Sequence, residues 1–199
     1  MHGQELPAAQ GQEWVRQLND AMAEQVASSG GRLLAYATLH LASPEAAARE
    51  LERASSRLKM TGSMLPTFFP QGDLSDARYD ALWAAAQSLD MPIVLHPTTD
   101  SPSACMFEAT PKFKGLYGRP IDTTVVATQL IMGGVFDRFP KLRLVLVHGG
   151  GFLPYQAGRL DREYKGPTGL AASEYVKRFY YDTVLMSTPA LRMLFDLVG

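Results

Sequence analysis

One apolar run, 144–147, ends at His148 and is followed at once by three glycines, and this stretch constrains the fold more than any other. Such a run is typical of a strand buried on both faces, and glycines let the backbone turn sharply into a helix. A second apolar run, 91–95, ends at His96 in the same way. Parallel sheets place their chemistry at the carboxyl ends of their strands, so we expect the two imidazoles to lie close together in one cavity.

Apolar runs and amphipathic segments alternate along the chain. We expect strands at 32–39, 62–65, 91–96, 144–147 and 179–183, with helical patterns between them. This alternation predicts an α/β fold with a parallel sheet, of the barrel or doubly wound type, in one domain spanning residues 1–199. Residues 97–120 contain four prolines and no clear period, which predicts a long insertion, either a functional lid or a disordered segment, before a helix around 125–133.

Composition excludes several classes of protein. With 19 basic and 20 acidic side chains, the formal net charge is −1, which argues against binding to nucleic acid or to a membrane surface. No apolar run approaches the roughly 20 residues that cross a bilayer. The one cysteine, Cys105, excludes an internal disulfide framework, and we expect a cytoplasmic protein.

Several segments together resemble the second amidohydrolase family, which includes aminocarboxymuconate-semialdehyde decarboxylase. The matching segments follow one another in family order: 44–53 (PEAAARELER), 93–97 (IVLHP), 133–142 (GGVFDRFPKL), 148–154 (HGGGFLP), 158–159 and 180–183. The resemblance implies a metal-dependent (β/α)₈ TIM barrel, of which this chain supplies strands three to seven.

The resemblance also implies roles for individual residues. His96 matches the family's metal-ligating histidine at the end of strand five, and His148 matches the acid/base at the end of strand six, which activates metal-bound water. Arg159 matches an arginine that reaches across a homodimer interface to bind the substrate carboxylate in the neighbouring subunit. The implied cofactor is one divalent metal ion, zinc, and the implied partner is a small carboxylic acid.

The chain also departs from the family pattern. It contains no His-x-His pair, and it stops at Gly199, ahead of the segment where the family places strand eight and its metal-binding aspartate. His96 alone does not hold a zinc ion, because such sites need three or four protein ligands. We therefore expect an incomplete barrel with open edges at 32–39 and 179–183, and a chain that self-associates.

These observations leave more than one function open. The leading interpretation is a metal-dependent carboxy-lyase that decarboxylates an unsaturated or aromatic acid; the alternatives are a hydrolase of the same family and a catalytically silent structural remnant. Single residues also have structural interpretations. His148 could cap its strand, Arg159 could lie on a solvated helix face, and Asp182 and His40 could be satisfied residues at strand ends. Cys105 has no evident base partner and is not expected to act as a nucleophile.

Overall fold

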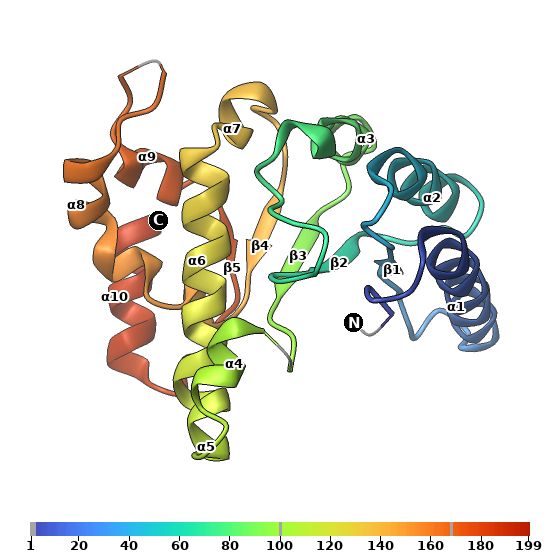
Figure 1. Cartoon of the computed structure of the whole chain (residues 1–199), viewed down its shortest axis with the longest axis horizontal. Coiled ribbons are helices and arrows are strands. Elements are labelled where there is room, and N and C mark those ends of the chain that lie inside the picture. The colour runs from blue at the N-terminus through green and yellow to red at the C-terminus, as the bar shows by residue number, and fades with distance from the viewer. Residues whose placement is uncertain (1–2, 100, 168) are drawn as a thin grey trace.

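The computed structural model describes residues 3–99, 101–167 and 169–199. Its strands form one parallel sheet in the order β1-β2-β3-β4-β5, so each strand lies beside the one that precedes it in the chain (Figure 1). The strands are β1 (Ala37–Thr38), β2 (Ser63–Pro66), β3 (Ile93–His96), β4 (Leu144–Leu146) and β5 (Tyr180–Tyr181). A doubly wound sheet reverses its strand order at a switch point, whereas a barrel keeps its strands in sequence. The described sheet is therefore wound like a barrel and spans five strands.

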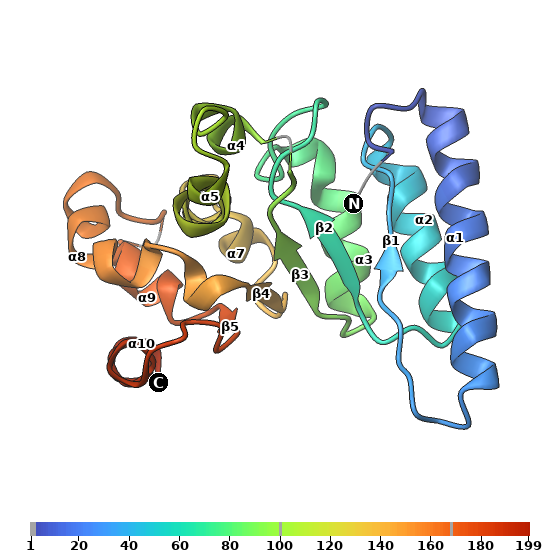
Figure 2. The ribbon, with the colours of Figure 1, turned by 90° about the horizontal axis from the view of Figure 1, so that it is seen from below.

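The helices follow the strands in alternation, as the sequence predicts. They are α1 (Ala8–Ser28), α2 (Pro44–Ser56), α3 (Asp80–Ser88), α4 (Pro102–Met106), α5 (Pro111–Phe113), α6 (Arg119–Met132), α7 (Val135–Arg138), α8 (Leu153–Glu163), α9 (Ala172–Val176) and α10 (Thr188–Val198). Two 3₁₀ turns, Ala77–Tyr79 and His148–Gly150, and a π-helix, Lys114–Gly118, complete the described elements. Figure 2 shows α1 beyond β1 at one end of the sheet and α10 near β5 at the other.

The core lies between the sheet and the helices that pack against it. Helix α2 begins at Pro44 and buries Ala47, Leu51 and Ala54 on one side, which is the helical spacing of its apolar residues. Trp83 of α3 is fully buried, and its indole N–H donates to the carbonyl of Leu74. Burial of this apolar surface is the main source of stability for the fold.

The first predicted strand, 32–39, is much shorter in the structure. Only Ala37–Thr38 forms β1, because β2 begins at Ser63 and offers ladder partners from that residue onward. Leu33 and Leu34 are exposed, at 53% and 77%. The apolar composition of this segment therefore reflects a connecting loop rather than a buried strand.

Within the segment 97–120, the described residues 101–120 are largely helical rather than irregular, and Asp100 lies outside the described residues. It contains α4, α5 and the π-helix, and α6 begins at Arg119, earlier than its apolar pattern indicates. Pro102, Pro111 and Pro120 each lie in the first turn of a helix. At that position a missing N–H breaks no helical hydrogen bond, so these prolines begin helices where the sequence suggested that they prevent them.

The outer edge of β1 is covered by side-chain amides from the N-terminal segment and α1. Asn19 accepts a hydrogen bond from the Thr38 N–H (2.9 Å) and donates to its carbonyl (3.0 Å), as a neighbouring strand would do. Gln4 donates to the Leu39 carbonyl and accepts from the Leu41 N–H. Because these backbone groups are satisfied, strand addition at this edge is blocked.

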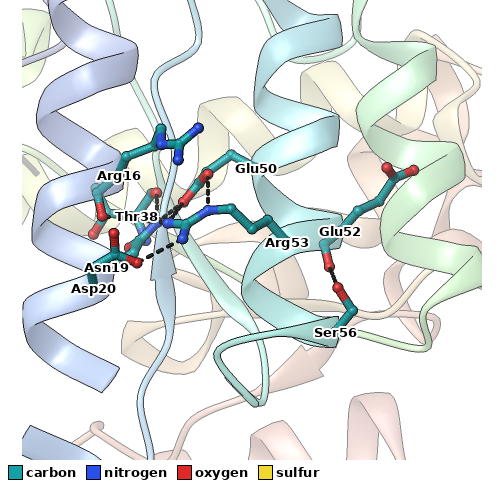
Figure 3. Close-up of polar contacts among 8 residues, drawn as sticks. All are labelled: Arg16, Asn19, Asp20, Thr38, Glu50, Glu52, Arg53 and Ser56. Carbon is teal, nitrogen blue, oxygen red and sulfur yellow. Dashed lines mark hydrogen bonds and ion pairs between the residues drawn. The ribbon is translucent and has the colours of Figure 1, made fainter. Parts of the chain in front are cut away.

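A partly buried ionic cluster holds Asn19 in place (Figure 3). The Glu50 carboxylate accepts from the Asn19 amide at 2.7 Å and is clamped by two N–H groups of Arg53, each at 2.8 Å. Arg53 also pairs with Asp20 on α1 at 2.6 Å. The Glu50 hydrogen bonds, ahead of the opposing effect of burial, raise the pKa of Arg53, which stays charged. The cluster thus joins α1, α2 and β1.

At the opposite edge, no further strand from the described residues pairs with β5. The Asp182 N–H donates to the Leu146 carbonyl. Successive residues of a strand direct their backbone N–H and C=O groups to opposite sides, so those of Tyr181 point away from β4. A cavity of about 470 Å³ lies between β5 and α10 and is lined by the exposed Leu191 and Phe195. The expectation of an open edge is therefore wrong for β1. At β5 an open edge stays a prediction, as does self-association of the chain.

Within residues 3–99, 101–167 and 169–199, no helix combines the length and the apolar character that a bilayer crossing requires.

Candidate active site

His96 and His148 lie side by side at the carboxyl end of the sheet. Leu95 of β3 pairs with Leu146 of β4, which brings the ends of the two strands to the same level. The ring centroids of the two histidines are 5.7 Å apart, with the ring planes tilted by 56°. The expected proximity of these two residues is confirmed.

The turn after β4 is built from residues in the left-handed region of backbone space. His148 has φ of 56°, and Gly149, Gly150 and Gly151 have φ of 59°, 79° and 65°. A non-glycine residue in this region is strained, so other contacts have to hold His148 there. The glycines after it are needed, because a Cβ at Gly151 would lie 2.2 Å from the Pro120 carbonyl oxygen.

Asp182, directly after β5, holds this turn. Its Oδ1 accepts hydrogen bonds from the N–H groups of Gly149 (2.8 Å) and Val184 (3.1 Å). The Asp182 carboxylate thereby ties the loop after β5 to the residue next to His148. Sequence reasoning favoured a structural role for this residue, and the structure places it where it supports the candidate catalytic histidine.

The surroundings of His148 disfavour its charged form. Burial of the half-buried ring lowers the pKa of His148 below its usual 6.5, and the nearby His96 and Arg119 add to this effect. The Asp182 carboxylate acts in the opposite direction. The ring's Nδ1 is buried and makes no hydrogen bond with any described residue. At neutral pH the imidazole is therefore neutral and able to accept a proton.

This pKa shift predicts a pH dependence of stability. Because the folded protein binds its proton on His148 less tightly than the unfolded chain, the free energy of unfolding decreases as the pH falls from 6.5 towards the lower folded-state pKa. Above pH 6.5 the contribution of neutral His148 to the free energy of unfolding is fully present. Urea titrations between about pH 5 and about pH 8 should give a flatter pH dependence for His148→Gln than for the unmodified chain. Identical pH dependences would contradict the assignment.

A cavity of about 660 Å³ opens beside His148. Among the described residues, its lining comes from the π-helix, the glycine turn, α8 and the loop after β5: Gly115, Leu116, Pro120, His148, Gly151, Phe152, Tyr155, Val184, Leu185 and Met186. His96 is not among these residues, so the expected shared cavity is found for one of the two imidazoles. The walls are mainly apolar and suit a small organic molecule.

The structure does not bring every candidate residue to this cavity. Arg159 lies exposed on α8 and is not part of the cavity lining. His40 is fully buried, with its ring against Gly11 of α1, and neither ring nitrogen has a hydrogen-bond partner among the described residues. Cys105 is free and exposed.

The described part of the chain does not assemble a metal site by itself. It contains no group of three or more histidine, cysteine, aspartate or glutamate side chains placed to hold a metal ion. His96 Nδ1 lies 2.8 Å from the carbonyl of Pro97, which leaves its Nε2 as the nitrogen free to bind an ion. The residues present thus fit part of a divalent metal site and not a complete one.

Sequence reasoning missed two contributors to the site. Thr124 of α6 accepts a hydrogen bond from the Phe152 N–H at 2.7 Å and so joins α6 to the glycine turn. Arg119 bears electrostatically on His148 from the start of the same helix. Both precede the apolar pattern around residues 125–133, and no local signal in the sequence connects them with a strand that begins at Leu144.

Comparison with known proteins identifies a common architecture. A family model described as "Amidohydrolase" matches residues 1–199. The decarboxylase orsB of Emericella nidulans is 36% identical over 168 residues, covering 77% of this chain and 49% of that protein. The chain spans about half the length of the curated relatives it matches.

Solved structures match over nearly the whole chain. The 5-carboxyvanillate decarboxylase of Sphingomonas paucimobilis superposes with a TM-score of 0.89 at 28% identity, covering 100% of this chain and 63% of that one. The dihydroxybenzoic acid decarboxylase of Polaromonas sp. JS666, solved with manganese and 2-nitroresorcinol, gives a TM-score of 0.87 at 30% identity, covering 96% and 63%.

Proposed function

Because this chain belongs to the amidohydrolase family, we propose that the protein to which it contributes is a carboxy-lyase acting on an aromatic or unsaturated carboxylic acid. The observation that carries the proposal is the neutral, half-buried His148 beside a largely apolar cavity at the carboxyl end of the sheet. Relatives named for the decarboxylation of dihydroxybenzoic acid and 5-carboxyvanillate support this class of substrate. Hydrolysis by the same residues is the alternative.

In this proposal His148 moves the proton of the reaction. Loss of CO₂ breaks a carbon–carbon bond and leaves its electron pair on the substrate carbon, which then takes up one proton. A neutral imidazole at the cavity wall takes up a proton from solvent water and delivers it to that carbon, and such general acid–base catalysis contributes about 10²–10⁴-fold in rate. Asp182 holds the turn that carries His148.

We further propose that His96 binds one divalent metal ion, zinc, with the Nε2 that its contact with Pro97 leaves free. When bound, the ion supplies positive charge that stabilises negative charge on the substrate. The manganese in the Polaromonas structure supports a divalent ion in this family. The described residues do not complete the ligand set of this ion.

The incomplete ligand set gives a prediction for the 199-residue chain. After dialysis against a weak chelator, it should retain far less than one equivalent of zinc or manganese, because fewer than three ligands give weak binding. Metal content can be measured by plasma emission spectrometry, with His96→Ala as the matched variant. Stoichiometric metal that is lost in His96→Ala would mean that the site is more complete than the described residues indicate.

Two further proposals concern assembly and location. Arg159 is exposed on α8, where a second subunit can reach it, which supports a homodimer in which Arg159 binds the substrate carboxylate of its neighbour. The same exposure also fits an arginine on a solvated helix face. Arg159→Gln should raise KM if Arg159 binds the substrate and leave KM unchanged if its side chain is only solvated. The single, free cysteine supports a cytoplasmic location.

The carboxy-lyase proposal is tested on the protein purified from its native cells, in the form in which those cells produce it. CO₂ release from 2,6-dihydroxybenzoate and from 5-carboxyvanillate is measured with manganese or zinc present. We expect activity that falls about 10²–10⁴-fold in His148→Asn and is unchanged in Cys105→Ser, whose side chain is exposed. Thermal unfolding shows whether His148→Asn is folded. No CO₂ release from any aromatic or unsaturated acid would overturn the proposal.

A further inference from the structure

The hydroxyl of Thr124 links the cavity beside His148, the His148 cavity, to the turn that carries this histidine. It accepts a hydrogen bond from the Phe152 N–H and donates one to the Pro120 carbonyl, each at 2.7 Å. We propose that Thr124 is a positioning residue, whose hydroxyl holds the His148 turn at a fixed distance from the wall against which the acid binds. This role deepens the carboxy-lyase proposal and rests on it.

Three elements of the cavity meet at this hydroxyl. Thr124 lies in the second turn of α6, which directly follows the π-helix in the chain. The π-helix contributes Leu116 to the cavity lining, and α6 contributes Pro120. Phe152 immediately precedes α8, and both Phe152 and Tyr155 of that helix line the cavity as well. The hydroxyl therefore fixes the helical wall, the glycine turn and the start of α8 relative to one another.

The glycine turn and the start of α6 are in close contact at this point. A Cβ at Gly151 would lie 2.2 Å from the Pro120 carbonyl oxygen and 2.7 Å from Thr124 Oγ1. The Gly151 N–H donates to the His148 carbonyl at 3.0 Å, so the residue that touches α6 is hydrogen-bonded to the one that carries the imidazole. A displacement at Thr124 is therefore passed to His148 through one backbone hydrogen bond.

The turn needs anchors because its backbone is strained. His148 has φ of 56°, and a non-glycine residue stays in this region only where surrounding contacts hold it. Asp182 holds the start of the turn through the Gly149 N–H. Thr124 holds its end through the Phe152 N–H. A displacement of about 1 Å in a reacting group can cost about 10²-fold in rate, so losing one anchor should affect the reaction more than the fold.

The test compares Thr124→Val, Thr124→Ser and Thr128→Val in the CO₂-release assay, on the same protein as the carboxy-lyase test. Valine keeps the branched shape of threonine and removes its hydroxyl, whereas serine keeps the hydroxyl. Thr128 is the matched control, because its hydroxyl donates to the Thr124 carbonyl within α6, at 2.8 Å, and not to the turn. We expect kcat to fall about 10²-fold in Thr124→Val with KM nearly unchanged, and Thr124→Ser and Thr128→Val to keep most of the activity.

Hydrogen–deuterium exchange gives a second measurement that does not depend on turnover. Mass spectrometry of the peptide covering 149–153 follows the Phe152 N–H, which Thr124 Oγ1 protects. Exchange there should be faster in Thr124→Val than in the unmodified protein, and unchanged in Thr128→Val. Thermal unfolding shows that each variant folds.

The proposal is overturned by equal kcat values in Thr124→Val and Thr128→Val, by a loss that Thr124→Ser does not restore, or by a rise in KM at unchanged kcat. Unchanged exchange of the Phe152 N–H in Thr124→Val overturns it as well. If the unmodified protein releases no CO₂, the carboxy-lyase proposal fails instead, and the exchange measurement alone decides whether the Thr124 hydroxyl holds the turn.

Discussion

Replacing Arg53 with methionine should lower the free energy of unfolding by about 3–5 kcal/mol. Glu50 is 5% exposed and relies on two hydrogen bonds from Arg53, so the variant leaves a buried carboxylate without its cation. Asp20 loses its partner on α2 as well. Methionine keeps much of the side-chain length and a good helix propensity, so the loss reports mainly on the ionic cluster.

Lys177→Met is the matched control for this substitution. Lys177 pairs with Glu174 at 2.6 Å, but the two side chains are 48% and 47% exposed. Solvent screens an exposed pair, so removing it should change the free energy of unfolding by no more than about 0.5 kcal/mol. Urea denaturation measures both variants. If Arg53→Met and Lys177→Met had similar effects, the cluster would not be what joins α1 to β1.

Replacing Gly151 with alanine should cost about 3 kcal/mol of stability and disturb the His148 cavity. Gly151 has φ of 65° and ψ of −123°, a conformation that only glycine adopts readily. Its new Cβ would also lie 2.2 Å from the Pro120 carbonyl oxygen and 2.7 Å from Thr124 Oγ1. Either the glycine turn or the start of α6 has to move.

Gly158→Ala is the control, and it should change stability in the opposite direction. Gly158 lies within α8, and a Cβ there would meet nothing within 4 Å. Alanine is favoured over glycine inside a helix by about 0.5–1 kcal/mol, so this variant should be more stable than the unmodified chain. Equal effects of the two glycine substitutions in urea denaturation would refute the role assigned to the turn.

Much of the architecture could be predicted from the sequence because its signals are local. The alternation of apolar strands with amphipathic helices specifies a parallel sheet, and strands that end in His96 and His148 place both rings at one edge. The family resemblance, carried by segments such as 148–154, is confirmed by the match over the whole chain. The roles of His96, His148 and Arg159 remain proposals.

The segment between β3 and α6 shows where local signals fail. Its prolines are compatible both with an irregular loop and with helix starts, and the choice depends on whether the following residues find something to pack against. Ser103, for example, is buried and donates to the Gly118 carbonyl, a contact between α4 and the π-helix. Such pairings between distant residues are not encoded in any one stretch of sequence.

The sequence by itself determined the order of strands and helices, the edge of the sheet that carries the two histidines, and the glycine turn after β4, because each follows from periodicity and backbone preference within a few residues. Only the tertiary structure decided that Asn19 closes the β1 edge, that Asp182 holds the His148 turn, and that Arg119 bears electrostatically on His148. These three results depend on distances between residues far apart in the chain, which packing sets and local sequence does not.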